Sequence, residues 1–258
     1  MADTPVLELQ GVSKGFGAVQ ALFEVDFHVS PGEVMALVGD NGAGKSTLIK
    51  CIAGIHPVDG GEIRFEGRSV QIGGPKDASR LGIEVVYQDL ALCDNLDVVQ
   101  NMYLGRELTD GARRLDETAM EAKARETLHS LSVTSMSSVR QTVAGLSGGQ
   151  RQSVAVAKAV MWNSRVVILD EPTAALGVAQ TRQVLELVRR LGEQGLAVIL
   201  ISHNLHDVFE VADSITVLRL GQNVAEYKRV ETNQQQVVEA ITAGKLSKVP
   251  GQQQEVAL

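Results

Sequence analysis

The sequence predicts an α/β fold: a mainly parallel β-sheet with antiparallel β-strands at its edge and an inserted α-helical subdomain. Short apolar runs alternate with helical patterns, polar residues collect where several of these runs end, and a glycine-rich loop joins one run to a helix. Strands that alternate with helices form parallel sheets, and such sheets bind ligands at the carboxyl ends of their strands. We therefore expect the functional residues to meet at that edge.

The first thirty residues predict two antiparallel edge strands. Val6–Val12 alternates apolar and polar side chains, and Ala21–Val29 forms the second expected strand. The segment Lys14-Gly15-Phe16-Gly17 between them is predicted to be a turn. Its aromatic residue, Phe16, has two possible roles: it stacks on a nucleotide base, or it fills the core of the hairpin.

The next segment has the pattern of a phosphate-binding loop. Residues 39–47 fit G-x-x-x-x-G-K-[ST]; they follow the apolar run Val34–Val38 and precede Leu48, Ile49 and Ile52, which have the spacing of a helix face. Backbone N–H groups of such a loop point at phosphate oxygens, and the helix adds its positive end. A glycine-rich turn with a solvated lysine is the alternative, and the flanking strand and helix argue against it.

Within this loop, the lysine and the hydroxyl residue have separate expected roles. Lys45 would reach the β- and γ-phosphates, and the Ser46 hydroxyl would ligate Mg²⁺. The residues predicted to bind the nucleotide from this loop are Gly39, Asn41, Gly42, Gly44, Lys45, Ser46 and Thr47.

The middle of the chain changes character after about residue 89. Before that point, turns separate short strands at Ile63–Phe65, Val70–Ile72 and Ile83–Gln88. From 89 to 163 no strong strand pattern occurs, and Asp116–Leu131 places apolar residues on one face of a charged helix. We expect a helical subdomain here.

The last part of the chain returns to alternating strands and helices. A glycine-rich segment opens a helix of small residues at Ser153–Val160, and a later helix is expected to stop at Gly192. The expected buried strands are Val166–Glu171, Leu196–Ile201 and Ile215–Leu220.

Two carboxylates end the first of these strands. Asp170 is placed to hold Mg²⁺ opposite Ser46, and Glu171 is placed to polarise the water that attacks the γ-phosphate. The alternative for Glu171 is that it merely caps the turn before Pro172.

The segment Leu146-Ser147-Gly148-Gly149-Gln150 is identical to the signature of ATP-binding cassette (ABC) ATPases. The chain from about Val6 to Ala243 resembles the nucleotide-binding domain of an ABC transporter. The resemblance implies a P-loop NTPase fold of the ABC ATPase type, with ATP and Mg²⁺ as cofactors and ATP hydrolysis as the activity. It divides the chain into a RecA-like ATP-binding core with an antiparallel β subdomain (1–88 and 164–244), a helical subdomain (89–163) and a flexible tail (245–258).

The resemblance also assigns residues. Phe16 matches the aromatic that stacks on adenine, Gln88 matches the glutamine near Mg²⁺ and the attacking water, and His203 matches the histidine that contacts the γ-phosphate. Without the other motifs, His203 would be interpreted as an ordinary histidine at the end of a strand. The signature residues of one copy close on the nucleotide held by another, so a head-to-tail homodimer is implied; these residues are Ser147, Gly148, Gly149 and Gln150.

One position departs from the family pattern. Gly177 stands where an aspartate is common, which places one contact between subunits in question. The segments 87–90, 100–106 and 173–177 are similar to bacterial importers of the ribose, xylose or fructose type. This resemblance implies monosaccharide import through a separate membrane permease, with a periplasmic solute-binding protein as an indirect partner.

Composition sets outer limits on function and location. The net charge of −7 disfavours nucleic acid as a partner, and the two cysteines lie in no metal-binding spacing. The apolar runs fall below the roughly 20 residues of a transmembrane helix, and no secretory signal opens the chain. The expected location is cytoplasmic, peripheral at the inner face of the cell membrane.

Two other functions remain to be compared with transport. An ABC ATPase that acts on DNA or ribosomes is the first, although DNA-repair members need a long coiled-coil insertion and translation factors normally carry two cassettes. A nucleotide-binding regulator without turnover is the second. Replacement of Glu171 tests this alternative, because only an enzyme loses hydrolysis.

Overall fold

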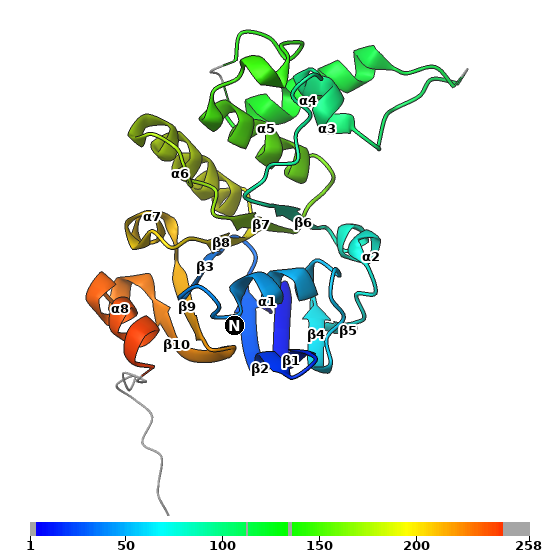
Figure 1. The fold of residues 1–258 in the computed structure, drawn as a ribbon. Helices are drawn as coiled ribbons and strands as arrows, with labels where there is room; N and C mark the ends of the chain where they lie inside the picture. Colours follow the sequence, from blue (N-terminus) through cyan, green and yellow to red (C-terminus); the bar gives the residue numbers. More distant parts are fainter. Residues whose placement is uncertain (1–3, 112, 134–135, 245–258) are drawn as a thin grey trace, which may run out of the picture.

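The computed structural model describes residues 4–111, 113–133 and 136–244. The chain forms a lower region built on two β-sheets and an upper region of helices (Figure 1). The predicted α/β fold with parallel and antiparallel strands is confirmed. The predicted flexible tail, 245–258, lies outside the described residues.

The larger sheet has six strands in the order β10-β9-β3-β8-β7-β6. Strands β9 to β6 run parallel, and β10 pairs with β9 antiparallel. Every residue of β3 and β8 is buried, because both faces of the sheet are covered, as is usual for parallel sheets. The strand bounds are β3 (Val34–Val38), β6 (Ile83–Val86), β7 (Val166–Asp170), β8 (Ala197–Ile201), β9 (Ser214–Arg219) and β10 (Gln222–Lys228).

The smaller sheet has four strands in the order β2-β1-β4-β5, with each neighbouring pair antiparallel. Its strands are β1 (Leu7–Phe16), β2 (Val19–Val29), β4 (Gly60–Phe65) and β5 (Arg68–Val70). The predicted turn at residues 14–17 is wrong in its bounds, because Lys14 to Phe16 belong to β1. Register shifts after Leu9 and Val12 interrupt the alternation of apolar and polar residues. The sequence pattern therefore does not predict the full length of β1.

Three groups of buried side chains hold these layers together. The first helix, α1 (Lys45–Ile52), packs its buried face, which includes Leu48 and Ile52, between the two sheets. On the opposite face of the six-stranded sheet lie α7 (Leu205–Val211) and α8 (Gln234–Ala243). Both faces of the sheet that carries the loop after β3 are therefore packed, which fixes where that loop starts.

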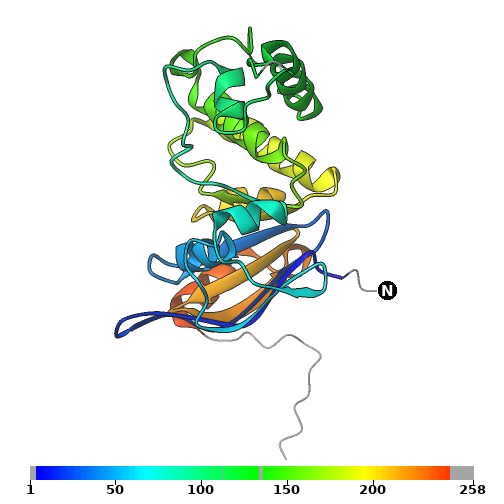
Figure 2. The same cartoon turned by 90° about the vertical axis from the view of Figure 1, so that its right-hand side faces the viewer.

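The third group of buried side chains joins the upper helices to the sheet. Figures 1 and 2 show these helices above the β6–β7 end of the sheet. The division at residues 89–163 stays a prediction. The upper helices are α3 (Val98–Tyr103), α4 (Glu117–Ser130), α5 (Gly148–Val160) and α6 (Val178–Glu193). Helix α2 (Pro75–Arg80) packs instead with the group around α1, and short 3₁₀ turns occur at η1 (Val143–Gly145) and η2 (Arg229–Glu231).

Helix α6 continues one residue past Gly192, so the predicted stop at this glycine is wrong. A Cβ at Gly192 would lie 3.2 Å from the Gly32 carbonyl oxygen. Glycine therefore allows helix α6 to approach the turn at Gly32 closely. The left-handed residue beyond the helix end is Gly195, with φ +87°.

Candidate nucleotide-binding site

A cavity of about 880 Å³ opens at the carboxyl ends of the parallel strands. The phosphate-loop pattern and the polar strand ends meet in it, although they are far apart in the sequence. Of the predicted site residues, it is lined by Gly39, Asn41, Gly42, Gly44, Lys45, Ser46, Thr47, Gln88, Asp170, Glu171 and His203.

The loop between β3 and α1 needs glycine at two of its positions. Gly39 has φ +152°, and a Cβ there would lie 2.2 Å from the Leu218 carbonyl oxygen. Gly44, the residue before α1, has φ +106°, and a Cβ there would lie 2.9 Å from Leu22 Cδ2. Larger residues would therefore strain the backbone and collide with their neighbours. The glycines keep the loop in the curve that exposes its N–H groups.

Lys45 lies across the loop rather than out in solvent. Its Nζ donates hydrogen bonds to the carbonyl oxygens of Gly39 at 2.6 Å and Asp40 at 3.0 Å. Burial lowers the pKa of Lys45, and the nearby carboxylates of Glu171, Asp40 and Asp170 oppose that shift. A half-buried cation that is bonded only to neutral oxygens is well suited to exchange them for phosphate oxygens.

The two strand-end carboxylates have different surroundings. Burial, followed by the adjacent Glu171, raises the pKa of Asp170 above its ordinary value, and Lys45 opposes the shift. Glu171 has φ +51°, a backbone conformation that non-glycine residues rarely adopt. The Glu171 carboxylate Oε2 lies 2.7 Å from His203 Nδ1 and accepts a hydrogen bond from His203 N at 3.4 Å, and the His203 side chain is 74% exposed. Two groups predicted to act at the γ-phosphate thus already touch.

The polar residues at this edge suit Mg²⁺ that is shared with a bound nucleotide better than a metal ion coordinated only by protein side chains. Ser46, Gln88 and Asp170 line the same cavity with one hydroxyl, one amide oxygen and one carboxylate. Within residues 4–111, 113–133 and 136–244, no group of three or more His, Cys, Asp or Glu side chains could hold a metal ion. Magnesium usually binds through one or two protein oxygens together with substrate phosphates, so this donor set fits it.

The signature residues lie elsewhere. Ser147 precedes α5, where its Oγ accepts a hydrogen bond from Gln150 N at 3.3 Å and its own N donates to Gln150 Oε1 at 2.9 Å. Ser147 and Gly148 are exposed, and Gly149 packs against Gln180 of α6. Ser147, Gly148, Gly149 and Gln150 are not among the residues that line the cavity. One chain therefore presents two separate helix N-termini suited to anions.

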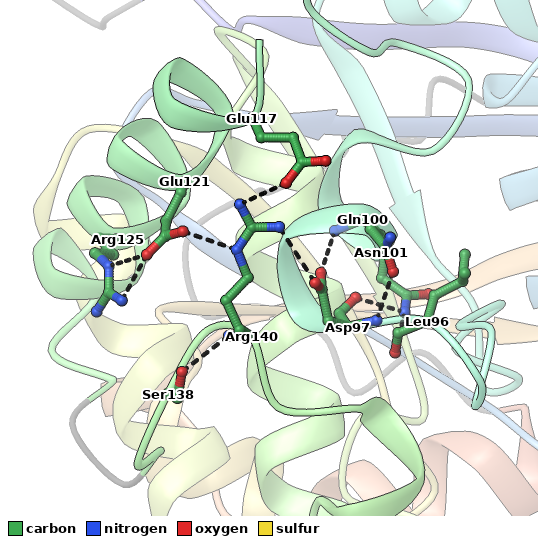
Figure 3. Close-up of polar contacts among 9 residues, drawn as sticks. All are labelled: Leu96, Asp97, Gln100, Asn101, Glu117, Glu121, Arg125, Ser138 and Arg140. Carbon is green, nitrogen blue, oxygen red and sulfur yellow. Dashed lines mark hydrogen bonds and ion pairs between the residues drawn. The ribbon is translucent and has the colours of Figure 1, made fainter. Parts of the chain in front are cut away.

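Arg140 anchors the segment that leads to the signature (Figure 3). Its guanidinium donates to Glu121 Oε2 at 2.7 Å and lies 3.4 Å from Asp97 Oδ2 and 3.2 Å from Glu117 Oε2. Asp97 caps α3, and Glu117 and Glu121 belong to α4. One arginine therefore links two helices to the chain that continues toward Ser147.

Phe16 does not line the cavity in this structure. Its ring packs edge-on against His56, with centroids 5.0 Å apart, and Lys14 Nζ lies 5.5 Å from its centroid. The side chain is 44% exposed, so it does not fill the hairpin core. The structure therefore leaves the stacking prediction for Phe16 untested, and the core-plug alternative is wrong.

Several cavity residues carry no clear signal in the sequence. Val19, Gln20 and Ala21 enter from the start of β2, and Leu220 enters from the β9–β10 turn. Val19 is 64% exposed and Leu220 is 75% exposed, and each lies next to a tight turn. An isolated apolar residue beside a turn is a weak signal, because single exposed apolar residues are common on surfaces.

A glycine-rich loop after a buried parallel strand, a lysine folded over it and carboxylates at the next strand end define a P-loop nucleotide-binding protein. Residues 22–174 match the family model for ABC transporters. The chain belongs to this family, as one of its ATP-binding, ATP-hydrolysing cassettes.

Relatives along most of the chain are import proteins. The chain is 49% identical to the fructose import ATP-binding protein FrcA of Rhizobium meliloti, over 87% of this chain and 88% of that protein. It is 46% identical to the xylose/arabinose import ATP-binding protein XylG of Sulfolobus acidocaldarius, over 95% of this chain and 96% of that protein. These names do not favour the alternative of an ATPase that acts on DNA or ribosomes.

Solved structures agree with the fold. An ATP-binding cassette of an ABC transporter in its ADP conformation is 26% identical, with a TM-score of 0.80 over 94% of this chain and 96% of that chain. A nucleotide-free cassette is 25% identical, with a TM-score of 0.79 over 93% and 95%. In the described part of this chain, no helix is both long and apolar enough to span a membrane.

Proposed function

We propose that this protein is the ATP-binding subunit of an importer that moves a monosaccharide through a separate membrane permease. The observation that carries the proposal is its identity of 49% and 46% to two sugar-import ATP-binding proteins along nearly their whole length. Both are named for sugars, so we assign the substrate class and leave the individual sugar to experiment.

In this proposal different cavity residues bind the phosphates, bind Mg²⁺ and act on the attacking water. Lys45 and the loop N–H groups hold the phosphates, and Ser46, Asp170 and Gln88 bind Mg²⁺ directly or through water. Glu171 polarises the attacking water, and His203 contacts the γ-phosphate, while Phe16 stacks on adenine. The shared cavity at the strand ends supports every one of these roles except that of Phe16.

The second anion-binding end supports a composite site. Ser147 and Gly148 are exposed and lie outside the cavity, so they are available to a nucleotide held by another copy. Two copies arranged head to tail with two-fold symmetry would bury two ATP molecules. ATP binding closes this pair and hydrolysis releases it, which supplies the mechanical step of transport.

The permease is proposed to dock in a smaller cavity of about 230 Å³ between β6, α3 and α5. Apolar residues such as Met102 and Trp162 line it together with Lys158, whose pKa is lowered by burial. The Lys158 side chain makes no hydrogen bond or ion pair with another residue in the described part of the chain, which suits a permease segment that carries a carboxylate. The protein would then act at the inner face of the membrane, with a periplasmic solute-binding protein as its indirect partner.

Hydrolysis is tested first on the purified chain. Glu171→Gln should nearly abolish Mg²⁺-dependent ATP turnover and preserve or strengthen ATP-dependent dimerisation, while Lys45→Ala should weaken nucleotide binding itself. Unchanged turnover in Glu171→Gln would remove Glu171 from its proposed role.

Transport is tested in cells that lack the gene. Uptake of labelled fructose, xylose, arabinose and ribose should fall for at least one sugar and return with the wild-type chain. The Glu171→Gln chain serves as the matched control and should not restore uptake. Normal uptake of all four sugars in the deletion strain would contradict the assignment to these sugars.

A further inference from the structure

A buried carboxylate outside the cavity joins the two segments that carry Glu171 and His203. Asp207, in α7, is only 3% exposed. Its Oδ2 accepts a hydrogen bond from Thr173 Oγ1 at 2.7 Å, and its Oδ1 accepts one from Asn204 Nδ2 at 2.9 Å. Both oxygens of one side chain are therefore committed, one to each segment.

These two partners lie beside the proposed reacting groups. Thr173 belongs to the turn that begins at Glu171, and Asn204 directly follows His203. On the cavity side, the same segments meet again through His203 Nδ1 and Glu171 Oε2 at 2.7 Å. The turn and the histidine segment are thus linked on two sides. At the cavity, Glu171 Oε2 also accepts a hydrogen bond from His203 N at 3.4 Å, and Glu171 N donates to the Ile201 carbonyl oxygen at 2.9 Å; behind the cavity, Asp207 makes the link.

The turn after Glu171 needs outside support. Glu171 and Ala175 have φ +51° and +60°, and such conformations in non-glycine residues cost about 1–3 kcal/mol each. Inside the turn, Ala174 N donates to the Glu171 carbonyl oxygen at 3.1 Å. The hydrogen bond from Thr173 to a buried carboxylate ties this strained turn to α7, in surroundings where charge-assisted hydrogen bonds are strong.

A capping role alone does not account for Asp207. Asn204 already caps α7, because its Oδ1 accepts a hydrogen bond from His206 N at 3.1 Å. Asp207 instead directs one oxygen away from its own helix, to Thr173.

We propose that Asp207 is a positioning residue for ATP hydrolysis: it sets where Glu171 stands relative to His203 by holding Thr173 and Asn204 together. This inference rests on the proposed roles of Glu171 and His203. Because a misplacement of about 1 Å at a reacting group can cost roughly 100-fold in rate, loss of the bridge acts on kcat rather than on nucleotide binding.

Three variants separate hydrogen bonding from packing and charge. Asp207→Leu keeps the approximate shape and removes both acceptors. Asp207→Asn keeps both links, because its amide oxygen accepts from Asn204 and its N–H donates to Thr173 Oγ1. Thr173→Val removes only the link to the turn. Thr181→Val is the matched control, because Thr181 lines the same surface cavity as Asp207 and makes no hydrogen bond to it.

The experiment measures kcat and KM for ATP, the ATP dissociation constant and Tm for each chain. We expect kcat to fall roughly 10- to 100-fold in Asp207→Leu and Thr173→Val, with the ATP dissociation constant within about threefold of wild type. Asp207→Asn should recover most of kcat, and Thr181→Val should match wild type.

The inference is overturned if kcat in Asp207→Leu and Thr173→Val stays within about twofold of wild type. It is also overturned if ATP affinity falls as far as kcat, or if Asp207→Asn is as impaired as Asp207→Leu. Glu171→Gln and His203→Ala are assayed in parallel. If these two lose turnover and the Asp207 variants do not, only this inference fails; if Glu171→Gln keeps turnover, the proposed role of Glu171 fails instead.

Discussion

At the scale of single residues, Asp170 lowers the stability of the nucleotide-free fold while it provides a carboxylate for ligand binding. Burial and the neighbouring Glu171 raise its pKa, so the folded protein holds this proton more tightly than the unfolded chain does. The stability linked to that proton is present below the ordinary pKa of an aspartate and is lost as pH rises through the raised pKa. At neutral pH the ionised carboxylate therefore destabilises the nucleotide-free protein.

Asp170→Asn should relieve this cost. At pH 7 without nucleotide we expect its Tm to exceed that of wild type by about 2–4 °C, which corresponds to about 1 kcal/mol in a domain of this size. The gain should shrink as pH falls through the raised pKa of Asp170, where the wild-type carboxylate takes up its proton. Thermal melts of both chains from pH 4 to 8 measure it. A gain that is independent of pH, or a lower Tm at pH 7, would contradict the explanation.

Most of the candidate site could be predicted because its residues carry local signals. The loop from Gly39 to Thr47 has a fixed spacing, and Asp170 and Glu171 end an apolar run. The contacts between Glu171 and His203, and between Thr173 and Asp207, join residues that are far apart in the sequence. No local sequence pattern predicts such contacts, because only the order of strands in the sheet brings these residues together.

At the scale of elements, Arg140 holds α3, α4 and the chain before the signature in one arrangement (Figure 3). Arg140→Met should lower Tm, because it leaves three neighbouring carboxylates without their shared cation. Arg125→Met is the control: among the described residues Arg125 forms an ion pair only with Glu121, and its side chain is 55% exposed. We expect the loss for Arg140 to be several times larger than for Arg125, measured by thermal melts in low salt. Equal losses would show that Arg140 is an ordinary surface charge.

Helix α6 begins with an unfilled capping position. Gly177 has φ −75° and ψ 164°, an extended backbone conformation that any residue can adopt, and it supplies no side-chain cap. A Cβ there would lie 2.6 Å from Gln180 Oε1, so the flexible end of that side chain must shift in any variant at this position. Gly177→Asp should gain about 0.3 kcal/mol of stability, or about 1 °C in Tm, because its carboxylate accepts a hydrogen bond in the first turn and faces the positive end of the helix. Gly177→Ala offers no acceptor, so an Asp variant that melts at or below the Ala variant would contradict this reasoning.

Several short helices and one strand could not be predicted from the sequence, for physical reasons. Helices α2, α3 and α7 have 6, 6 and 7 residues, which is too short for a clear apolar period. Strand β10 is half exposed and alternates weakly, and its burial pattern shows no buried residue. The long strands and helices of the core were predicted because each buries a continuous run or face.

At the scale of the whole molecule, the chain presents two phosphate-binding ends that do not meet. The cavity at the end of β3 contains the loop, the strand-end carboxylates and His203, whereas Ser147 lies on the exposed start of α5. In the proposed dimer, each cavity becomes a complete ATPase site only when a second copy supplies Ser147 and its neighbours.

Complementation between two defective chains tests whether the site is shared between two copies. One chain carries Ser147→Arg, which blocks the signature, and the other carries Lys45→Ala, which disables the loop. Each chain alone should be nearly inactive, and circular dichroism confirms that each is folded. In a mixed pair, the intact loop of the first chain faces the intact signature of the second, so one complete site forms.

ATP hydrolysis by the equimolar mixture is the measurement. We predict that it recovers to roughly a quarter of the wild-type rate per chain, because half of the randomly formed pairs are mixed and each holds one complete site of two. A mixture that stays as inactive as its separate components, while both chains still associate, would show that the two phosphate-binding ends do not combine across subunits.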